Sequence, residues 1–295
     1  MRLNPHQFAA FAHAAREGSF SRAAARLGLS QSAVSQHVAS LERTIGASLL
    51  VRSRSGLTLT PAGRDFFELA DRYATLDQLI GEKVEGYRTL GRGHLNVIAN
   101  APRPALELLA AYKRANPNVE VSFTLFDWTS AMRLLRERQV DVGIVTEPSA
   151  MKDCIVAEIG RARYVAYVPV DHPMATRRSV SVTDLKRETV LLPEEGSFTQ
   201  RIVSRKLSKL GERFDNVIRT TTFPLMKEAV LHGVGIGIFL SDAMHPSTRI
   251  TTLAIDELPE SYATCLVAPA DKARIFAVRA FLDVAFARER PVAPA

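Results

Sequence analysis

Two short amphipathic segments joined by a glycine-containing turn near the N-terminus constrain the fold most. The first segment has its apolar side at Ala23, Ala24 and Leu27. The turn is Gly28-Leu29-Ser30, and its serine can accept hydrogen bonds from the free amides at a helix start. The second segment repeats apolar residues at spacings of 4, 3 and 4, at Val34, Val38, Leu41 and Ile45. This pattern predicts a helix-turn-helix.

The polar side of the second helix predicts that it reads DNA bases. Its outward positions carry Gln31, Ser32, Ser35 and Gln36. Glutamine can bond adenine through both amide atoms, and serine is short enough to let a helix lie deep in the major groove. The plain alternative is a set of three amphipathic helices whose polar residues serve solubility alone.

A β-hairpin is expected between Leu49 and Thr60, with arginines at its tip. We expect Arg43, Arg52 and Arg54 to contact phosphates, and His37 to make an adjacent backbone or base contact. The net charge agrees with this placement. Of the formal +7, residues 1–64 carry +6 from eight arginines against two acids, residues 65–91 carry −3, and the remaining 204 residues carry +4. Such a basic head is typical of a protein that binds a polyanion.

These residues resemble the LysR-type transcriptional regulators. The motif runs from Gly18 to Val38 and continues through Leu41-Glu42, Ile45-Gly46 and Arg52 to Leu59-Thr60-Pro61-Ala62-Gly63. Ser32 stands where many members have proline, and both residues start a helix well. The resemblance implies a winged helix-turn-helix DNA-binding domain over residues 1–60, in a transcription regulator that acts on double-stranded DNA, with RNA polymerase as a further candidate partner.

A long linker helix is expected over residues 61–91. Thr60 and Pro61 suit its first turn, and an apolar stripe follows at Phe66, Leu69, Tyr73, Leu76 and Ile80, spaced 3, 4, 3 and 4 as in a coiled coil. We interpret the stripe as a dimerisation surface, which agrees with the family's linker helix; the alternative is packing on the chain's own C-terminal part. A homodimer would place two heads on the half-sites of a near-palindromic operator. The resemblance implies a homotetramer as well.

Residues 92–295 alternate strand-like and helical runs, which predicts an α/β fold with parallel sheets. The resemblance implies a two-lobed, periplasmic-binding-protein-like effector domain. Lobe I would hold residues 92–166 and 266–288, and lobe II residues 167–265.

Loops at the carboxyl ends of the predicted strands are the expected effector site, because helix N-termini there offer unpaired amides. Ser197 and Thr199 would hold an anionic group or simply cap their helix, and Arg103 would neutralise charge. The other candidate contacts are Asn100, Trp128, Thr129, Thr146, Phe198 and Phe223. We therefore expect a small organic anion as effector. Met226-Lys227-Glu228-Ala229-Val230 and Tyr262-Ala263-Thr264-Cys265-Leu266 resemble the branch associated with aminoethylphosphonate catabolism, so a phosphonate and a carboxylate both remain open.

Catalysis, cofactors and metals are not indicated. The seven histidines are scattered, and neither a GxSxG elbow nor a P-loop occurs. Gly233, Gly235 and Gly237 lie between a helix and a strand, the reverse of a dinucleotide site. Cys154 and Cys265 are expected to be free thiols.

The chain also lacks an apolar run of membrane-spanning length and a signal-like N-terminus, so a soluble, cytoplasmic protein is expected. Two rival functions remain: a solute-binding or ligand-processing protein with vestigial DNA binding, and a repressor that needs no ligand.

Overall fold

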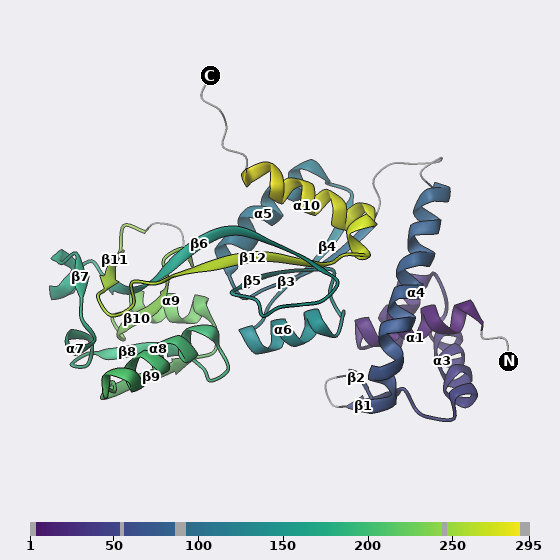
Figure 1. Ribbon diagram of the computed structural model, residues 1–295, viewed down its shortest axis with the longest axis horizontal. Helices are drawn as coiled ribbons and strands as arrows, with labels where there is room; N and C mark the ends of the chain where they lie inside the picture. Colours follow the sequence, from purple (N-terminus) through teal and green to yellow (C-terminus); the bar gives the residue numbers. More distant parts are fainter. Residues whose placement is uncertain (1–3, 54–55, 86–92, 244–246, 290–295) are drawn as a thin grey trace, which may run out of the picture.

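The computed structural model describes residues 4–53, 56–85, 93–243 and 247–289. It has a helical head at one end, an α/β lobe in the middle and a second α/β lobe at the other end (Figure 1). The head and the two lobes each have a separate hydrophobic core. The predicted combination of a winged helix-turn-helix, a linker helix and a two-lobed α/β domain is confirmed.

The head contains three helices: α1 (Pro5–Glu17), α2 (Phe20–Leu27) and α3 (Gln31–Ile45). Ser19 and Ser30 cap α2 and α3, each accepting a backbone N–H with its side chain. All three helices end at a glycine in the left-handed conformation. The predicted hairpin consists of β1 (Leu50–Ser53) and β2 (Gly56–Leu59). Glu42 fixes its start, because the carboxylate accepts the backbone N–H groups of Leu49 and Leu50 at 2.7 and 3.1 Å.

The linker helix α4 spans Pro61–Glu85, and residues 86–92 lie outside the described part of the chain. Its apolar stripe divides between two surroundings. Phe66 and Tyr73 contact the ring of Phe8 in α1. The remaining three members are exposed, with 64% for Leu69, 55% for Leu76 and 56% for Ile80.

Lobe I is built on a sheet in the order β4-β3-β5-β12-β6. Its elements are β3 (Gly93–Ala99), α5 (Pro102–Ala115), β4 (Val119–Leu125), α6 (Trp128–Arg136), β5 (Val142–Thr146), β12 (Ser261–Pro269), the short helix η2 (Lys272–Arg274) and α10 (Phe276–Glu289). Strand β3 is parallel to β4 and β5, as the alternating pattern predicts. Helices α5 and α10 cover one face of the sheet and α6 covers the other (Figure 1).

Lobe II continues the sheet in the order β6-β10-β8-β9, with β11 on β6 and β7 on β11. Its elements are β6 (Cys154–Pro169), η1 (Pro173–Thr176), β7 (Ser179–Val180), α7 (Val182–Leu185), β8 (Thr189–Pro193), α8 (Phe198–Leu210), β9 (Asn216–Thr220), α9 (Phe223–Leu231), β10 (Ile236–Leu240) and β11 (Ile250–Ile255). Strand β8 is parallel to β9 and β10.

Strand β6 is longer than the predicted strand Tyr164–Val168, because it begins at Cys154. Residues 154–163 pair with β12 in lobe I, and residues 164–169 pair with β10 and β11 in lobe II. The first part alternates half-buried and exposed side chains and includes Glu158 and Arg161, so it has no continuous apolar run. The paired strands β6 and β12 therefore join the lobes.

Gly63 allows α4 to start close against the hairpin. A Cβ atom there would lie 2.0 Å from the carbonyl oxygen of Leu49, whereas Gly81 in the same helix has no atom within 4 Å of an added Cβ. Gly63→Ala should therefore lower the free energy of unfolding of the head by about 2 kcal/mol or more through overpacking. Gly81→Ala should raise it by up to about 1 kcal/mol through helix propensity. Urea unfolding followed by circular dichroism measures both, and equal effects would contradict the close approach.

Candidate functional site

Helix α3 presents a polar face that is free for a partner. Gln31, Ser32, Gln36 and Arg43 are exposed, and Ser35 is half-buried. The opposite face, with Val34, Val38 and Leu41, is buried in the core of the head. The Ser21 hydroxyl donates to Gln31 Oε1 at 2.7 Å, so the side chain at the start of α3 is held toward α2. The structure thus brings the predicted base-reading residues to one surface.

Two of the other predicted DNA contacts, Arg52 and His37, do not lie on this polar face of α3. Arg52 is exposed on β1 of the hairpin. His37 is half-buried, with its ring 6.1 Å from that of His6, and lies about 100° or more around the helix from Ser32, Gln36 and Arg43. Arg54 lies outside the described residues.

A cavity of about 340 Å³ lies between the two lobes. The N-terminal ends of four helices meet at its wall: α5 through Pro102, α6 through Trp128, α8 through Ser197 and α9 through Phe223. Seven of the nine predicted effector contacts line it, namely Asn100, Trp128, Thr146, Ser197, Phe198, Thr199 and Phe223. Further aromatic walls come from Phe126, Tyr164 and Phe239, which the sequence did not single out.

Buried hydroxyl groups face this cavity. Thr146 is 1% exposed, and its Oγ1 has no hydrogen-bond partner among the described residues. Its backbone N–H donates to Asn100 Oδ1 at 2.9 Å, which ties two cavity residues together. Thr199 Oγ1 accepts the Tyr164 hydroxyl at 3.3 Å, and burial raises the pKa of Tyr164. The wall thus offers neutral hydrogen-bonding groups between aromatic rings.

Three contacts join the lobes at the mouth of the cavity. Thr129 Oγ1 donates to the Gly196 carbonyl at 2.9 Å. The rings of Trp128 and Phe198 lie 6.1 Å apart, and the Arg201 guanidinium stacks 4.0 Å from the centre of the Trp128 ring. Arg201 could not be chosen from sequence, because its partner Trp128 lies 73 residues away in the other lobe.

Two predicted effector contacts are not part of the cavity wall. Arg103 donates through Nε to Glu107 at 2.9 Å, one helical turn later in α5. Thr129 is engaged with Gly196, as described above. Among the described residues, the wall holds carboxylates but neither lysine nor arginine. Asp127 caps α6 by accepting the Ser130 N–H, and Glu195 lies 4.0 Å from Arg219.

Comparison with known proteins decides the family. Residues 5–64 match the family model for the bacterial regulatory helix-turn-helix protein of the lysR family, and residues 89–289 match the LysR substrate binding domain. The chain belongs to the LysR family. Its members are DNA-binding transcriptional regulators with a substrate-binding domain, so the protein is a transcriptional regulator.

Known regulators and solved structures are similar to this protein over most of its length. The RuBisCO operon transcriptional regulator of Allochromatium vinosum is 28% identical and covers 88% of each chain. The regulator CbbR of Xanthobacter flavus is 26% identical and covers 95% of this chain and 88% of its own. A full-length OxyR variant from Pseudomonas aeruginosa has a TM-score of 0.75 at 20% identity, covering 97% of this chain and 95% of its own. CbnR in complex with its target DNA has a TM-score of 0.51 at 21% identity, covering 96% and 99%.

The described residues of this LysR-family chain contain neither a metal-binding cluster nor a membrane-spanning helix. No group of three or more histidine, cysteine or acidic side chains is placed to hold a metal ion. No helix there has both the length and the apolar character needed to cross a membrane.

The unpartnered Thr146 hydroxyl allows a test of the cavity wall. Thr146→Val should raise the free energy of unfolding by about 1 kcal/mol, because a buried hydroxyl without a partner is removed, and should weaken effector binding. Thr264→Val is the matched control. Thr264 pairs with Thr146 across β5 and β12 and is equally unpartnered, but it does not line the cavity. Thermal unfolding should show a similar stabilisation of both variants, whereas titration with a compound found by thermal-shift screening should show weaker binding for Thr146→Val alone. Equal affinity in both variants would contradict the assignment.

Proposed function

We propose that this LysR-family regulator reads a near-palindromic operator with α3 and the β1–β2 wing, and that a small organic anion in the interlobe cavity changes its DNA binding. The observation that supports DNA reading is the exposed polar face of α3, in a domain whose hairpin also exposes Arg52. Gln31, Ser32, Ser35 and Gln36 supply specificity, and Arg43, Arg52 and Arg54 supply phosphate contacts. His37 stays a prediction as a contact at the edge of this surface. Action on the chromosome would place the protein in the cytoplasm.

The anionic effector is supported by the helix termini rather than by basic side chains. Four helix N-termini carry partial positive charge toward one cavity. The hydroxyls of Thr146, Ser197 and Thr199 add neutral donors, while the rings of Trp128, Phe198 and Phe223 favour a ligand with an apolar part. Because the described residues of the wall include carboxylates but neither lysine nor arginine, an effector with one anionic group is favoured over a multiply charged one.

A thermal-shift screen of the protein against carboxylates, phosphonates, and neutral and cationic compounds tests this effector class. It also tests the predicted likeness to the aminoethylphosphonate branch. Stabilisation by neutral or cationic compounds alone would overturn the anion proposal. A protein that binds its operator identically with every compound would instead favour the ligand-independent repressor.

Arg52→Ala should weaken binding to operator and to unrelated DNA alike, and should reduce the slope of log affinity against log salt by about one, because one phosphate contact is lost. Arg178→Ala is the control, since it removes the same charge from an exposed position in lobe II. The operator is first selected from random DNA, and fluorescence anisotropy over a salt series measures the slope. An unchanged slope for Arg52→Ala would remove the wing from the DNA contact.

The exposed part of the linker stripe is proposed as the dimer contact. Leu76→Glu should disrupt pairing of α4 with a second copy and roughly halve the particle mass at micromolar concentration, because a charge enters an apolar seam. Val170→Glu, at a similarly exposed position in lobe II, should leave the mass unchanged. Sedimentation velocity measures both, and an unchanged mass for Leu76→Glu would contradict dimerisation through the stripe. Tetramer formation through the effector domains, and contact with RNA polymerase, stay predictions.

A further inference from the structure

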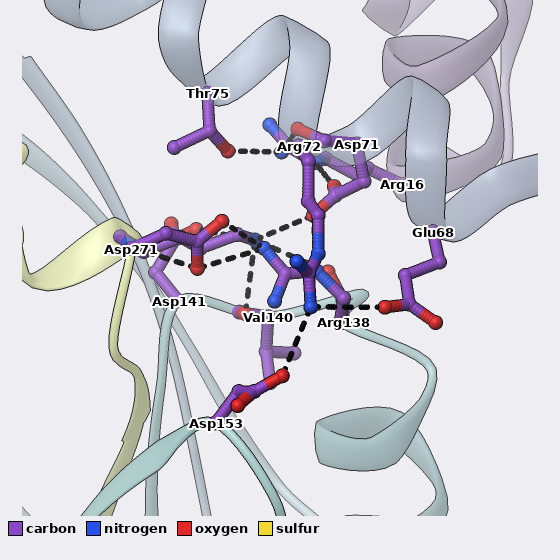
Figure 2. Close-up of polar contacts among 11 residues, drawn as sticks. Arg16, Glu68, Asp71, Arg72, Thr75, Arg138, Val140, Asp141, Asp153 and Asp271 are labelled. Atoms are coloured by element: carbon purple, nitrogen blue, oxygen red, sulfur yellow. Dashed lines mark hydrogen bonds and ion pairs between the residues drawn. The ribbon is translucent and has the colours of Figure 1, made fainter.

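One buried carboxylate joins the DNA-binding head to lobe I. Asp71 on α4 has no exposed surface, and its two oxygens bind arginines from distant parts of the chain (Figure 2). Arg16 of α1 donates through Nε to Oδ1. Arg138, between α6 and β5, donates through Nε to Oδ2 at 2.8 Å. A single side chain of the linker helix thus contacts both the head and lobe I.

The charges around Asp71 are balanced on each side of this contact. In lobe I, Arg138 donates to both oxygens of Asp271 at 2.9 and 2.7 Å. The fully buried Lys272 ammonium lies 3.9 Å from Asp71 and donates to Asp141 at 3.1 Å. If α4 left lobe I, Arg16 would keep Asp71, Arg138 would keep Asp271, and Lys272 would keep Asp141. Every charge would keep a partner. Opening a buried ion pair is most unfavourable when it leaves one charge unpaired, and that would not happen here.

The carboxylate stays ionised across the physiological pH range. Burial alone would raise the pKa of Asp71, but Lys272, Arg16 and Arg138 lower it to about 2. At neutral pH the contact is therefore one between a carboxylate anion and cationic side chains.

The rest of the interface is polar and loosely packed. Arg72 binds Asp153 at 3.0 Å, and Glu82 accepts the Phe276 N–H at the start of α10 at 2.9 Å. Leu79 adds an apolar contact to the core of lobe I. Beside these contacts lies a cavity of about 330 Å³ lined by residues of the head, the linker and lobe I. Interfaces of this kind resemble those between domains that move relative to each other.

Helix α6 connects this interface to the effector cavity. Trp128 begins α6, lines the cavity and stacks under Arg201 of lobe II. Arg138 lies two residues beyond the other end, in the left-handed conformation with φ of 53°. A nine-residue helix is about 14 Å long and moves as a rigid unit. Helix α6 thus links the cavity wall at Trp128 to the chain segment that carries Arg138.

We propose that Asp71 is a positioning residue for regulation: it docks the linker helix and head on lobe I through Arg138, and α6 carries movement of the cavity wall to this contact. The docking follows from the contacts alone, whereas the regulatory part rests on the proposed function.

The first experiment measures docking without DNA or effector. Hydrogen exchange of the full-length protein is compared with that of Arg138→Gln, which keeps Asp71 paired with Arg16 and is expected to fold. Residues 71–82 and 271–277 should exchange about tenfold faster, because a buried charge pair across the interface is lost, while α3 and lobe II should be unchanged. Arg133→Gln is the matched control, since it removes an arginine from α6 whose partner is Glu137 at 3.0 Å on the same surface.

The second experiment measures transmission. Arg201→Ala removes the stack on Trp128 and changes the balance between lobe positions. It should change operator affinity by at least about threefold in the wild-type and Arg133→Gln backgrounds, and by less than about 1.5-fold in the Arg138→Gln background. Operator DNA selected from a random library is the probe, with affinity measured at one salt concentration.

Each outcome decides one part of the proposal. Unchanged exchange in Arg138→Gln overturns the docking role of Asp71. An Arg201→Ala effect of equal size in all backgrounds, or of none, overturns transmission through α6. Failure to select any operator contradicts the proposed function, and the exchange experiment still decides the docking.

Discussion

The pairing of β6 with β12 is the interaction that joins the two α/β lobes, and the position of the cavity between them depends on it. Strand β6 gives its first part to the lobe I sheet and its last part to lobe II, and β12 runs beside it through the crossing. Both lobe cores are therefore attached to the same two strands. Because parallel strands on either side end toward the gap between the lobes, the helices that follow them begin there. The interlobe cavity, its hydroxyls and its aromatic walls are a consequence of this topology.

The linker helix divides its side chains between the head, lobe I and solvent. Phe66 and Tyr73 face α1, and Asp71 with Glu82 faces lobe I. Leu69, Leu76 and Ile80 remain exposed. The first two contacts lie within one chain, so self-association through the exposed face would leave the docking of the head on lobe I intact.

Local signals predicted the head and the alternating elements well. Serine caps and glycine ends mark α2 and α3, and apolar periodicity marks their buried faces. The bounds and orientation of these helices therefore follow from interactions between residues close in sequence. The first part of β6 was not predicted, because its side chains are half exposed and charged. Arg103 shows a different limit: its partner Glu107 is one turn away, but only the fold reveals that this pair lies outside the cavity wall. The Arg201 and Trp128 stack and the contacts of Asp71 join residues far apart in sequence, which no local pattern reports.

Two acidic residues of the linker helix bind lobe I instead of facing solvent only. Residues 65–91 carry a formal charge of −3, which by itself would suggest a solvated helix. Yet Asp71 is buried among Arg16, Arg138 and Lys272, and Glu82 holds the start of α10. Charge thus docks the head on lobe I through a buried carboxylate, while the proposed contact with DNA uses exposed arginines. Salt screens exposed charges far more than buried ones. Rising ionic strength should therefore release the head from DNA while it remains docked on lobe I, so that docking can bias DNA binding without competing with it for the same groups.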